Sequence, residues 1–116
     1  MATGVAQQGD FPLDSELFLD ARPIPGSKRI PNMDIAGDSS FVFEMWCNRV
    51  EGQLVIAGDT ITVVAGPPTE RSCTPLQAQR DADLIAALNA VTNWRRAGED
   101  LLLVGPSTLR FKAATH

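Results

Sequence analysis

The sequence predicts an α+β domain in which a curved, partly barrel-like antiparallel β-sheet packs on one main α-helix. Two observations predict this class. Strand-type segments lie on both sides of a single helical segment, and several of them alternate buried-type with outward-facing residues, which is typical of a sheet with one buried face. The 116 residues suffice for one hydrophobic core but not for two. We therefore expect one domain over residues 13–113, preceded by a flexible N-terminal segment at residues 1–12.

The strands expected before the helix differ in how they are recognised. In the Ser40–Trp46 segment Phe41, Phe43 and Met45 occupy alternate positions, which is the period of a half-buried strand. The Gly58-Asp59 pair predicts a tight hairpin turn between its two flanking strands. Prolines at positions 23, 25 and 31 predict an irregular connection, because proline cannot donate to a central ladder. The four expected strands are Ser15–Ala21, Ser40–Trp46, Gln53–Ala57 and Thr60–Val64.

The helix has a complete set of start signals. Thr74 suits the N-cap, Pro75 suits the first helical position, and Gln77 completes a capping box. An apolar stripe follows and predicts one face packed on the sheet; its members are Leu84, Ile85, Leu88, Val91 and Thr92. After the helix we expect a hairpin of Asn93–Arg96 and Leu101–Val104 with its turn at residues 98–100, then a last strand at Thr108–Lys112.

Composition excludes several classes of protein. The net charge of −4 argues against a general nucleic-acid binder, which needs cationic side chains to neutralise phosphates. No apolar run approaches the roughly 20 residues that span a bilayer. The first ten residues lack a basic region followed by a hydrophobic stretch, so no signal peptide is predicted as the sequence is written.

The residue inventory predicts no catalytic residue, no cofactor and no metal site. The single histidine is the final residue, His116, which is badly placed as a general base for a serine or cysteine nucleophile. Two cysteines and this histidine do not form a convincing zinc set. Four carboxylates considered for acid–base chemistry show no diagnostic spacing and are expected at the solvated surface: Glu51, Asp59, Glu70 and Asp81.

Cys47 and Cys73 are the two cysteines, 26 positions apart, and permit a single disulfide. The residues alone leave two states open, a disulfide or two buried reduced thiols.

Dispersed motifs across Leu17 to Lys112 resemble the META domain, the HslJ-like family of small envelope and stress-associated bacterial proteins. The resemblance rests on a Cys-Asn pair after a strand, a glycine soon after it, a Thr-x-x-x-Cys segment, a helix, a Gly-x-x-Leu-x-Leu strand and a closing Leu-x-Phe strand. The matching residues are Cys47, Asn48, Gly52, Thr69, Cys73, Leu84, Leu88, Val91, Gly98, Leu101, Leu103, Leu109 and Phe111. Trp46 stands where the family usually has glycine, and Arg71 replaces a usual apolar residue.

The resemblance implies an antiparallel sheet against one helix and residence in the periplasm or cell envelope. It implies a secretion or lipoprotein leader on the precursor, and it supplies no established catalytic activity. In that oxidising compartment a Cys47–Cys73 disulfide is favoured over two thiols. The expected partner is another envelope protein, with no nucleic acid and no direct membrane span.

Four residues near the cysteines are candidates for motif or binding roles: Trp46, Asn48, Arg49 and Arg71. Asn48 is expected to bond the backbone of its own loop. A tryptophan flanked by two arginines would form a partner-binding patch.

The leading hypothesis is a non-enzymatic domain with a structural, stress-related or protein-binding role. The first alternative, suggested by the similar fold of secretin pilot proteins, is a carrier of lipid or small apolar ligands in a sheet–helix cavity lined by Phe41, Phe43, Leu88 and Phe111. The second is a thiol-dependent enzyme that uses Cys73, which lies just before the expected helix N-terminus.

Overall fold

The computed structural model describes residues 11–113 as a closed antiparallel β-barrel with one helix. Each strand pairs with the next along the chain, and β1 pairs with β8. The elements are β1 (Ser15–Leu19), β2 (Asn32–Ile35), β3 (Ser40–Glu44), β4 (Arg49–Ala57), β5 (Thr60–Ala65), α1 (Pro75–Asn89), β6 (Asn93–Ala97), β7 (Asp100–Val104) and β8 (Leu109–Ala113). The sheet thus closes completely, where the sequence predicted a partly barrel-like sheet.

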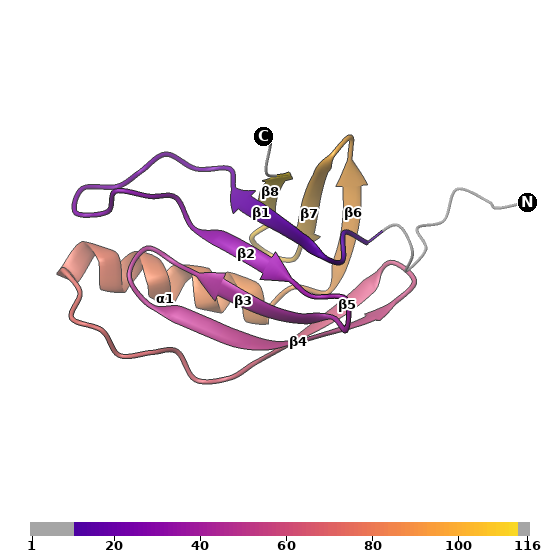
Figure 1. Ribbon diagram of the computed structural model, residues 1–116, viewed down its shortest axis with the longest axis horizontal. Coiled ribbons are helices and arrows are strands. Elements are labelled where there is room, and N and C mark those ends of the chain that lie inside the picture. Colours follow the sequence, from indigo (N-terminus) through magenta and orange to yellow (C-terminus); the bar gives the residue numbers. More distant parts are fainter. Residues whose placement is uncertain (1–10, 114–116) are drawn as a thin grey trace, which may run out of the picture.

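The barrel is uneven around its circumference. β4 and β5 form a long hairpin, whereas β5 and β6 share only the pair Thr60–Asn93. The helix connects β5 to β6 and runs beside the long strands, while β6 to β8 stand steeply to those strands, above the β4–β5 hairpin in Figure 1. At the narrow β5–β6 contact, the Trp94 indole donates to the Gly58 carbonyl oxygen at 2.8 Å and fastens the β4–β5 turn to β6.

The core lies inside the barrel and under the helix, as strand alternation predicts. Phe41, Phe43 and Met45 are each at most 2% exposed, and Trp94 is a core residue at 1%. Phe11 is 3% exposed and its ring packs edge-on against Trp94, with centroids 5.0 Å apart. The prediction of a flexible segment at residues 1–12 is therefore wrong at Phe11, whose apolar ring gains by burial. Residues 1–10 lie outside the described part of the chain.

The helix begins as predicted. The Thr74 hydroxyl accepts from the Gln77 amide and the Gln77 side chain accepts from the Thr74 amide, so both halves of the capping box are present. Leu84 and Leu88 are buried on its sheet-facing side. The helix ends at Asn89, so Val91 belongs to the core from beyond the helix and Thr92 is exposed.

Several strand predictions needed correction. The strands predicted to end at Ala21 and Trp46 end at Leu19 and Glu44. β2 occupies part of the stretch from Pro23 to Gly37, for which no strand was predicted; Met33 and Ile35 face the core from it. β4 begins at Arg49, four residues earlier than predicted, because Arg49 and Val50 pair with Glu44 and Phe43 of β3.

At Gly52 the backbone of β4 lies very close to atoms of β3 and β5. A Cβ built at this position would clash with the Val64 carbonyl oxygen and lie 2.9 Å from the Ala65 Cα and 3.0 Å from the Phe41 ring. A glycine is needed here for close backbone approach, because no side-chain carbon fits.

Candidate functional site

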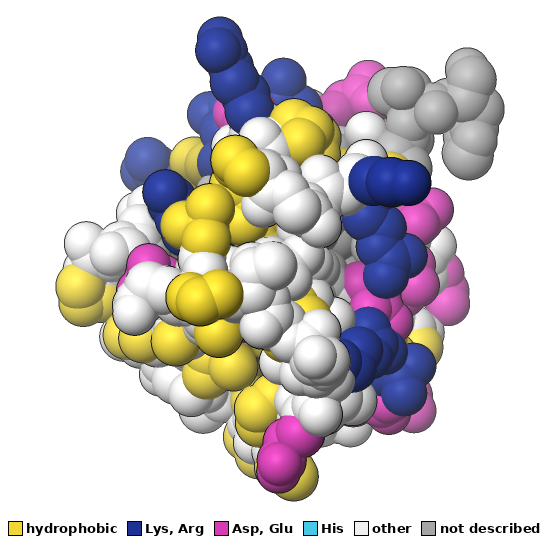
Figure 2. Space-filling model, turned by 90° about the vertical axis from the view of Figure 1, so that its left-hand side faces the viewer, with side chains coloured by type: hydrophobic (Ala, Val, Ile, Leu, Met, Phe, Trp, Pro, Cys, Tyr) yellow, Lys and Arg dark blue, Asp and Glu magenta, His cyan; other side chains and the backbone are white. Residues whose placement is uncertain are grey.

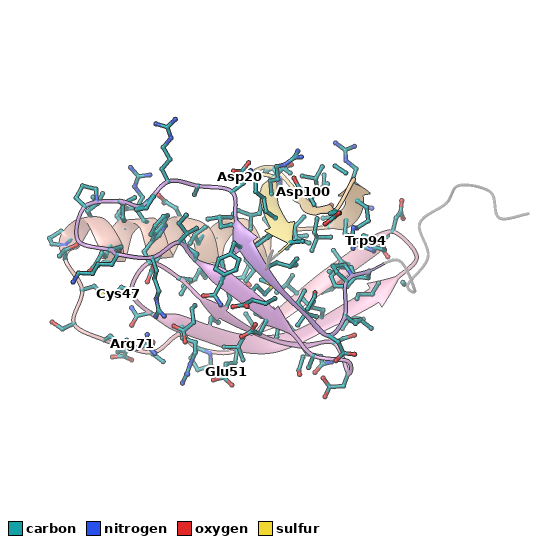
Figure 3. The ribbon with its side chains drawn as sticks, turned by 45° about the horizontal axis from the view of Figure 1, so that its top comes forward. Asp20, Cys47, Glu51, Arg71, Trp94 and Asp100 are labelled. Atoms are coloured by element: carbon teal, nitrogen blue, oxygen red, sulfur yellow. A yellow bond between two sulfur atoms is a disulfide. The ribbon has the colours of Figure 1, made fainter. Side chains whose placement is uncertain are left out.

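The two cysteines form a disulfide, with Cα atoms 6.0 Å apart. It joins the loop between β3 and β4 to the residue before the helix N-cap, at the end of the molecule where Cys47 and Arg71 lie (Figure 3). The expected pairing of Cys47 with Cys73 is thus confirmed. Because these are the chain's only cysteines, the bridge leaves no free thiol for the enzyme alternative.

Asp81 holds the β3–β4 loop from the helix. Its carboxylate is 3% exposed and accepts the backbone N–H groups of Trp46 at 2.8 Å, Cys47 at 3.2 Å and Asn48 at 2.7 Å. The expectation that Asp81 lies at the solvated surface is wrong. A carboxylate can be buried here because three amides satisfy it, and the loop needs the same bonds for its own donors.

Asn48 connects this loop to the segment before the helix. Its Oδ1 accepts from the Thr69 hydroxyl at 3.0 Å and from the Arg71 amide at 2.7 Å, and its Nδ2 lies 3.4 Å from the Cys73 sulfur. Thr69 in turn accepts the Arg49 amide at 2.9 Å. The polar atoms of Asn48 are therefore used within the protein, but they bond the segment before the helix and not, as expected, the backbone of Asn48's own loop.

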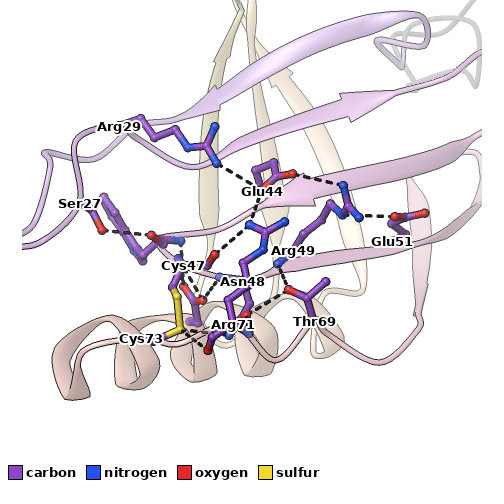
Figure 4. Close-up of polar contacts among 12 residues, drawn as sticks. Ser27, Arg29, Glu44, Cys47, Asn48, Arg49, Glu51, Thr69, Arg71 and Cys73 are labelled. Carbon is purple, nitrogen blue, oxygen red and sulfur yellow. Dashed lines mark hydrogen bonds and ion pairs between the residues drawn. A yellow bond between two sulfur atoms is a disulfide. The ribbon is translucent and has the colours of Figure 1, made fainter.

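We define the loop pair as residues 46–49 and 69–73. The disulfide, Asp81 and Asn48 fix these two segments against each other and against the helix (Figure 4). The helix also secures the preceding β1–β2 connection, because the Gln77 side chain donates to the Gly26 carbonyl and the Ser27 hydroxyl.

Trp46 is half-buried and packs against the core. Within residues 11–113 the non-glycine residues with left-handed φ are Asp14 and Ser39, so Trp46 fills the usual glycine position without that conformation. The structure thus brings Trp46 to the loop pair, although much of its surface is covered.

Arg49 and Arg71 meet at Glu44. The Glu44 side chain is 20% exposed; its Oε1 lies 3.3 Å from Arg71 Nη1 and 3.5 Å from Arg29 Nη2, and its Oε2 lies 3.7 Å from Arg49 Nη1 (Figure 4). Arg71 Nη1 also donates to the Cys47 carbonyl at 3.0 Å, and Arg49 Nε lies 3.3 Å from Glu51. We call Arg29, Arg49 and Arg71 the arginine cluster; their side chains are 66%, 40% and 41% exposed.

Arg49 and Arg71 were predicted as candidate site residues, whereas the third arginine, Arg29, and the carboxylate that joins them, Glu44, were not. Glu44 could have been flagged, because it is the charged residue on the outward face of a clear alternating strand. Arg29 could not, because it reaches Glu44 from an irregular connection whose path depends on the helix.

The residues expected to line an apolar cavity pack instead against each other. Phe43, Leu88 and Phe111 are at most 1% exposed, and the Phe43 and Phe111 rings meet at 5.8 Å. The fourth predicted residue, Phe41, is 2% exposed and borders a hollow between β1, β2 and β3 that is also lined by acidic side chains such as Asp14 and Glu16. Three other hollows on the surface of residues 11–113 include none of the four predicted residues. This packing gives no support to the carrier alternative.

No group of three His, Cys, Asp or Glu side chains in residues 11–113 is arranged to hold a metal ion. Across the same range, the helix is neither long nor apolar enough to cross a membrane. His116 lies outside the described residues.

The sequence profile of the META domain matches residues 7–115, nearly the whole chain. The chain belongs to the META domain family. No curated protein matches it significantly. A protein from Burkholderia xenovorans, solved by NMR, is similar to this META domain with a TM-score of 0.70 and 20% identity, over 90% of this chain and 84% of that one.

A second solved structure is a DUF4847 family protein from Bacteroides vulgatus. It is similar over 71% of this chain, with a TM-score of 0.58 and 20% identity. The match covers 57% of that protein's length. At these identities the two structures show a shared fold.

Proposed function

We propose that this META domain is a non-enzymatic protein of the bacterial cell envelope that binds another protein through the loop pair and its arginine cluster. The observation that carries the proposal is preorganisation. Two loops are fixed by a disulfide and by two side chains that bond inward, while the guanidinium groups stay exposed. Binding to a surface that is already ordered costs less conformational entropy.

The surface around the loop pair has the composition of a protein interface. Figure 2 looks onto this end of the molecule: basic side chains lie along one side, with acidic ones among them, next to a band of hydrophobic side chains. Leu76, in the first helical turn, is 37% exposed, and Pro23 and Pro25 are exposed beside the segment that Gln77 holds. Apolar surface bordered by arginines is typical of protein–protein contacts.

The disulfide supports the envelope part of the proposal, because such bonds persist in oxidising compartments and are rare in the bacterial cytosol. Membership of the META domain family supports the same location. A stress-related role would follow from the identity of the partner.

Photo-crosslinking in cells of the source bacterium tests this function. A photoreactive phenylalanine derivative replaces Ser72, which is exposed between Arg71 and Cys73. In the matched control it replaces Thr62, which is exposed on the outer face of β5. We expect one protein to crosslink from position 72 and not from 62, and to disappear when Arg49 and Arg71 are both changed to Gln. Equal labelling from both positions, or none from 72, would contradict the proposal.

A further inference from the structure

The arginine cluster is held in place without using all its hydrogen-bonding capacity. A guanidinium has five N–H donors. Among the described residues, the side chain of Arg29 contacts Glu44 through Nη2, and that of Arg71 contacts both Glu44 and the Cys47 carbonyl through Nη1. Both groups keep other donors for a ligand.

The three ion pairs that Glu44 forms with the arginine cluster are long. The distances of 3.3, 3.5 and 3.7 Å exceed the roughly 2.7–2.9 Å of a strong charge-assisted bond. Three guanidinium groups share this one carboxylate. A second carboxylate, that of Glu51, contacts Arg49 alone. The three arginines thus outnumber the two carboxylates in direct contact with them, Glu44 and Glu51, while the Asp81 carboxylate is occupied by backbone amides of the loop pair.

The positions of two of the guanidinium groups are constrained through their backbones. The Arg71 amide donates to Asn48 and the Arg49 amide to Thr69, within the disulfide-linked loop pair. Guanidinium groups with unused donors, carried on an ordered backbone as in Arg71, are common recognition elements for carboxylate and phosphate.

We propose that the arginine cluster is a binding site for an oxyanion, a carboxylate or phosphate group that sits beside Glu44 and competes with it for Arg29 and Arg71. This rests on the proposed function, since it names the chemistry by which the loop pair recognises its partner. A carboxylate would come from an acidic segment of a protein, and a phosphate from a phosphorylated ligand.

NMR titration of the arginine Nε–Hε signals tests the site, with succinate and pyrophosphate as separate probes at low ionic strength. We expect saturable shifts in the cluster, lost in the R29Q/R71Q variant and unchanged in R95Q, a control at an exposed position of β6. Tighter binding of succinate assigns the site to acidic protein segments, and tighter binding of pyrophosphate to phosphorylated ligands. Amide spectra confirm that the variants fold, as expected because exposed ion pairs contribute little to stability.

The variant E44Q tests the competition. Removing a like charge about 4 Å from the ligand should tighten anion binding by about fivefold in a watery environment. Weaker binding in E44Q would overturn the placement beside Glu44. The absence of saturable shifts in wild type up to about 1 mM anion, where the ionic strength stays at about 0.01 M or below, would overturn the site. Crosslinking at Ser72 without anion binding would remove this inference and leave the protein-binding function. Anion binding without a crosslink would remove the protein-binding function and leave the anion site.

Discussion

Asp81 is a buried carboxylate whose partners are backbone amides rather than a cation. It accepts from three consecutive residues of the β3–β4 loop and thereby fixes the start of the loop pair. Its neighbour in sequence, Asp83, is exposed and accepts from the Gln79 side chain one turn earlier. The two residues therefore provide a matched pair for measuring what the buried bonds contribute.

Changing Asp81 to Asn should lower the free energy of unfolding by about 2–3 kcal/mol, because the amide keeps one acceptor oxygen and loses the charge that strengthens three bonds. Asp83→Asn should change it by less than about 0.5 kcal/mol, as for most surface substitutions. Urea denaturation of both variants makes the comparison. Equal losses would mean that the three amide bonds do not matter for stability.

Gly52 shows the effect of a missing side chain. Gly52→Ala should cost about 3 kcal/mol, because the methyl group must displace the backbone of β5. At Gly58, where φ is +61° and no atom lies within 4 Å, Ala should cost about 1–2 kcal/mol from backbone strain alone. Thermal unfolding of the two variants shows which substitution lowers the stability more. A smaller loss at Gly52 than at Gly58 would contradict the close approach.

Elements with local signals were predictable from the sequence, and those with long-range partners were not. The helix start depends on Thr74, Pro75 and Gln77, which lie within four positions, so its capping box was predicted in full. The Gly58-Asp59 turn was predictable for the same reason. β2 is four residues long and follows Pro31, so two apolar residues in alternation were too few to indicate a strand before its pairing with β1 and β3 was known.

The candidate site divides in the same way. The pairing of Cys47 with Cys73 was predictable from the family resemblance. A structural role for Asn48 was predictable from its residue type, but its partners were not, because they lie in a segment more than 20 positions away. The burial of Asp81 was not, because it depends on how the β3–β4 loop lies on the helix, 33 positions away for the Asn48 bond.

The disulfide and the hydrogen bonds of the loop pair act together at the scale of elements. Replacing both cysteines by serine should lower the free energy of unfolding by about 3 kcal/mol, the chain-entropy contribution of a loop of this length. The loops should keep their conformation, because Asp81 and Asn48 still hold them. Urea denaturation measures the first effect, and the amide shifts of residues 46–49 report the second. Native stability in the double variant, or lost native shifts in the loop, would contradict one half of this expectation.

The whole molecule is a barrel in which the helix lies between the strands that close least completely. β5 and β6 share a single pair, and the Trp94 side chain and backbone amide bond the β4–β5 turn across this contact. Closure joins β1 to β8, the first and last strands, and no local pattern in either segment predicts such a pairing. The long strands and the helix then extend to one end, which carries the loop pair and the arginine cluster (Figures 1 and 3).

The most direct test of this account is the backbone order of the loop pair in the oxidised protein, measured by ¹⁵N relaxation. If the disulfide, Asp81 and Asn48 preorganise the binding surface, the amides of residues 46–49 and 69–73 should show order parameters near 0.85, about those of rigid strands. Values below about 0.6 in either segment would contradict the claim that the arginine cluster is presented on an ordered surface before any partner binds.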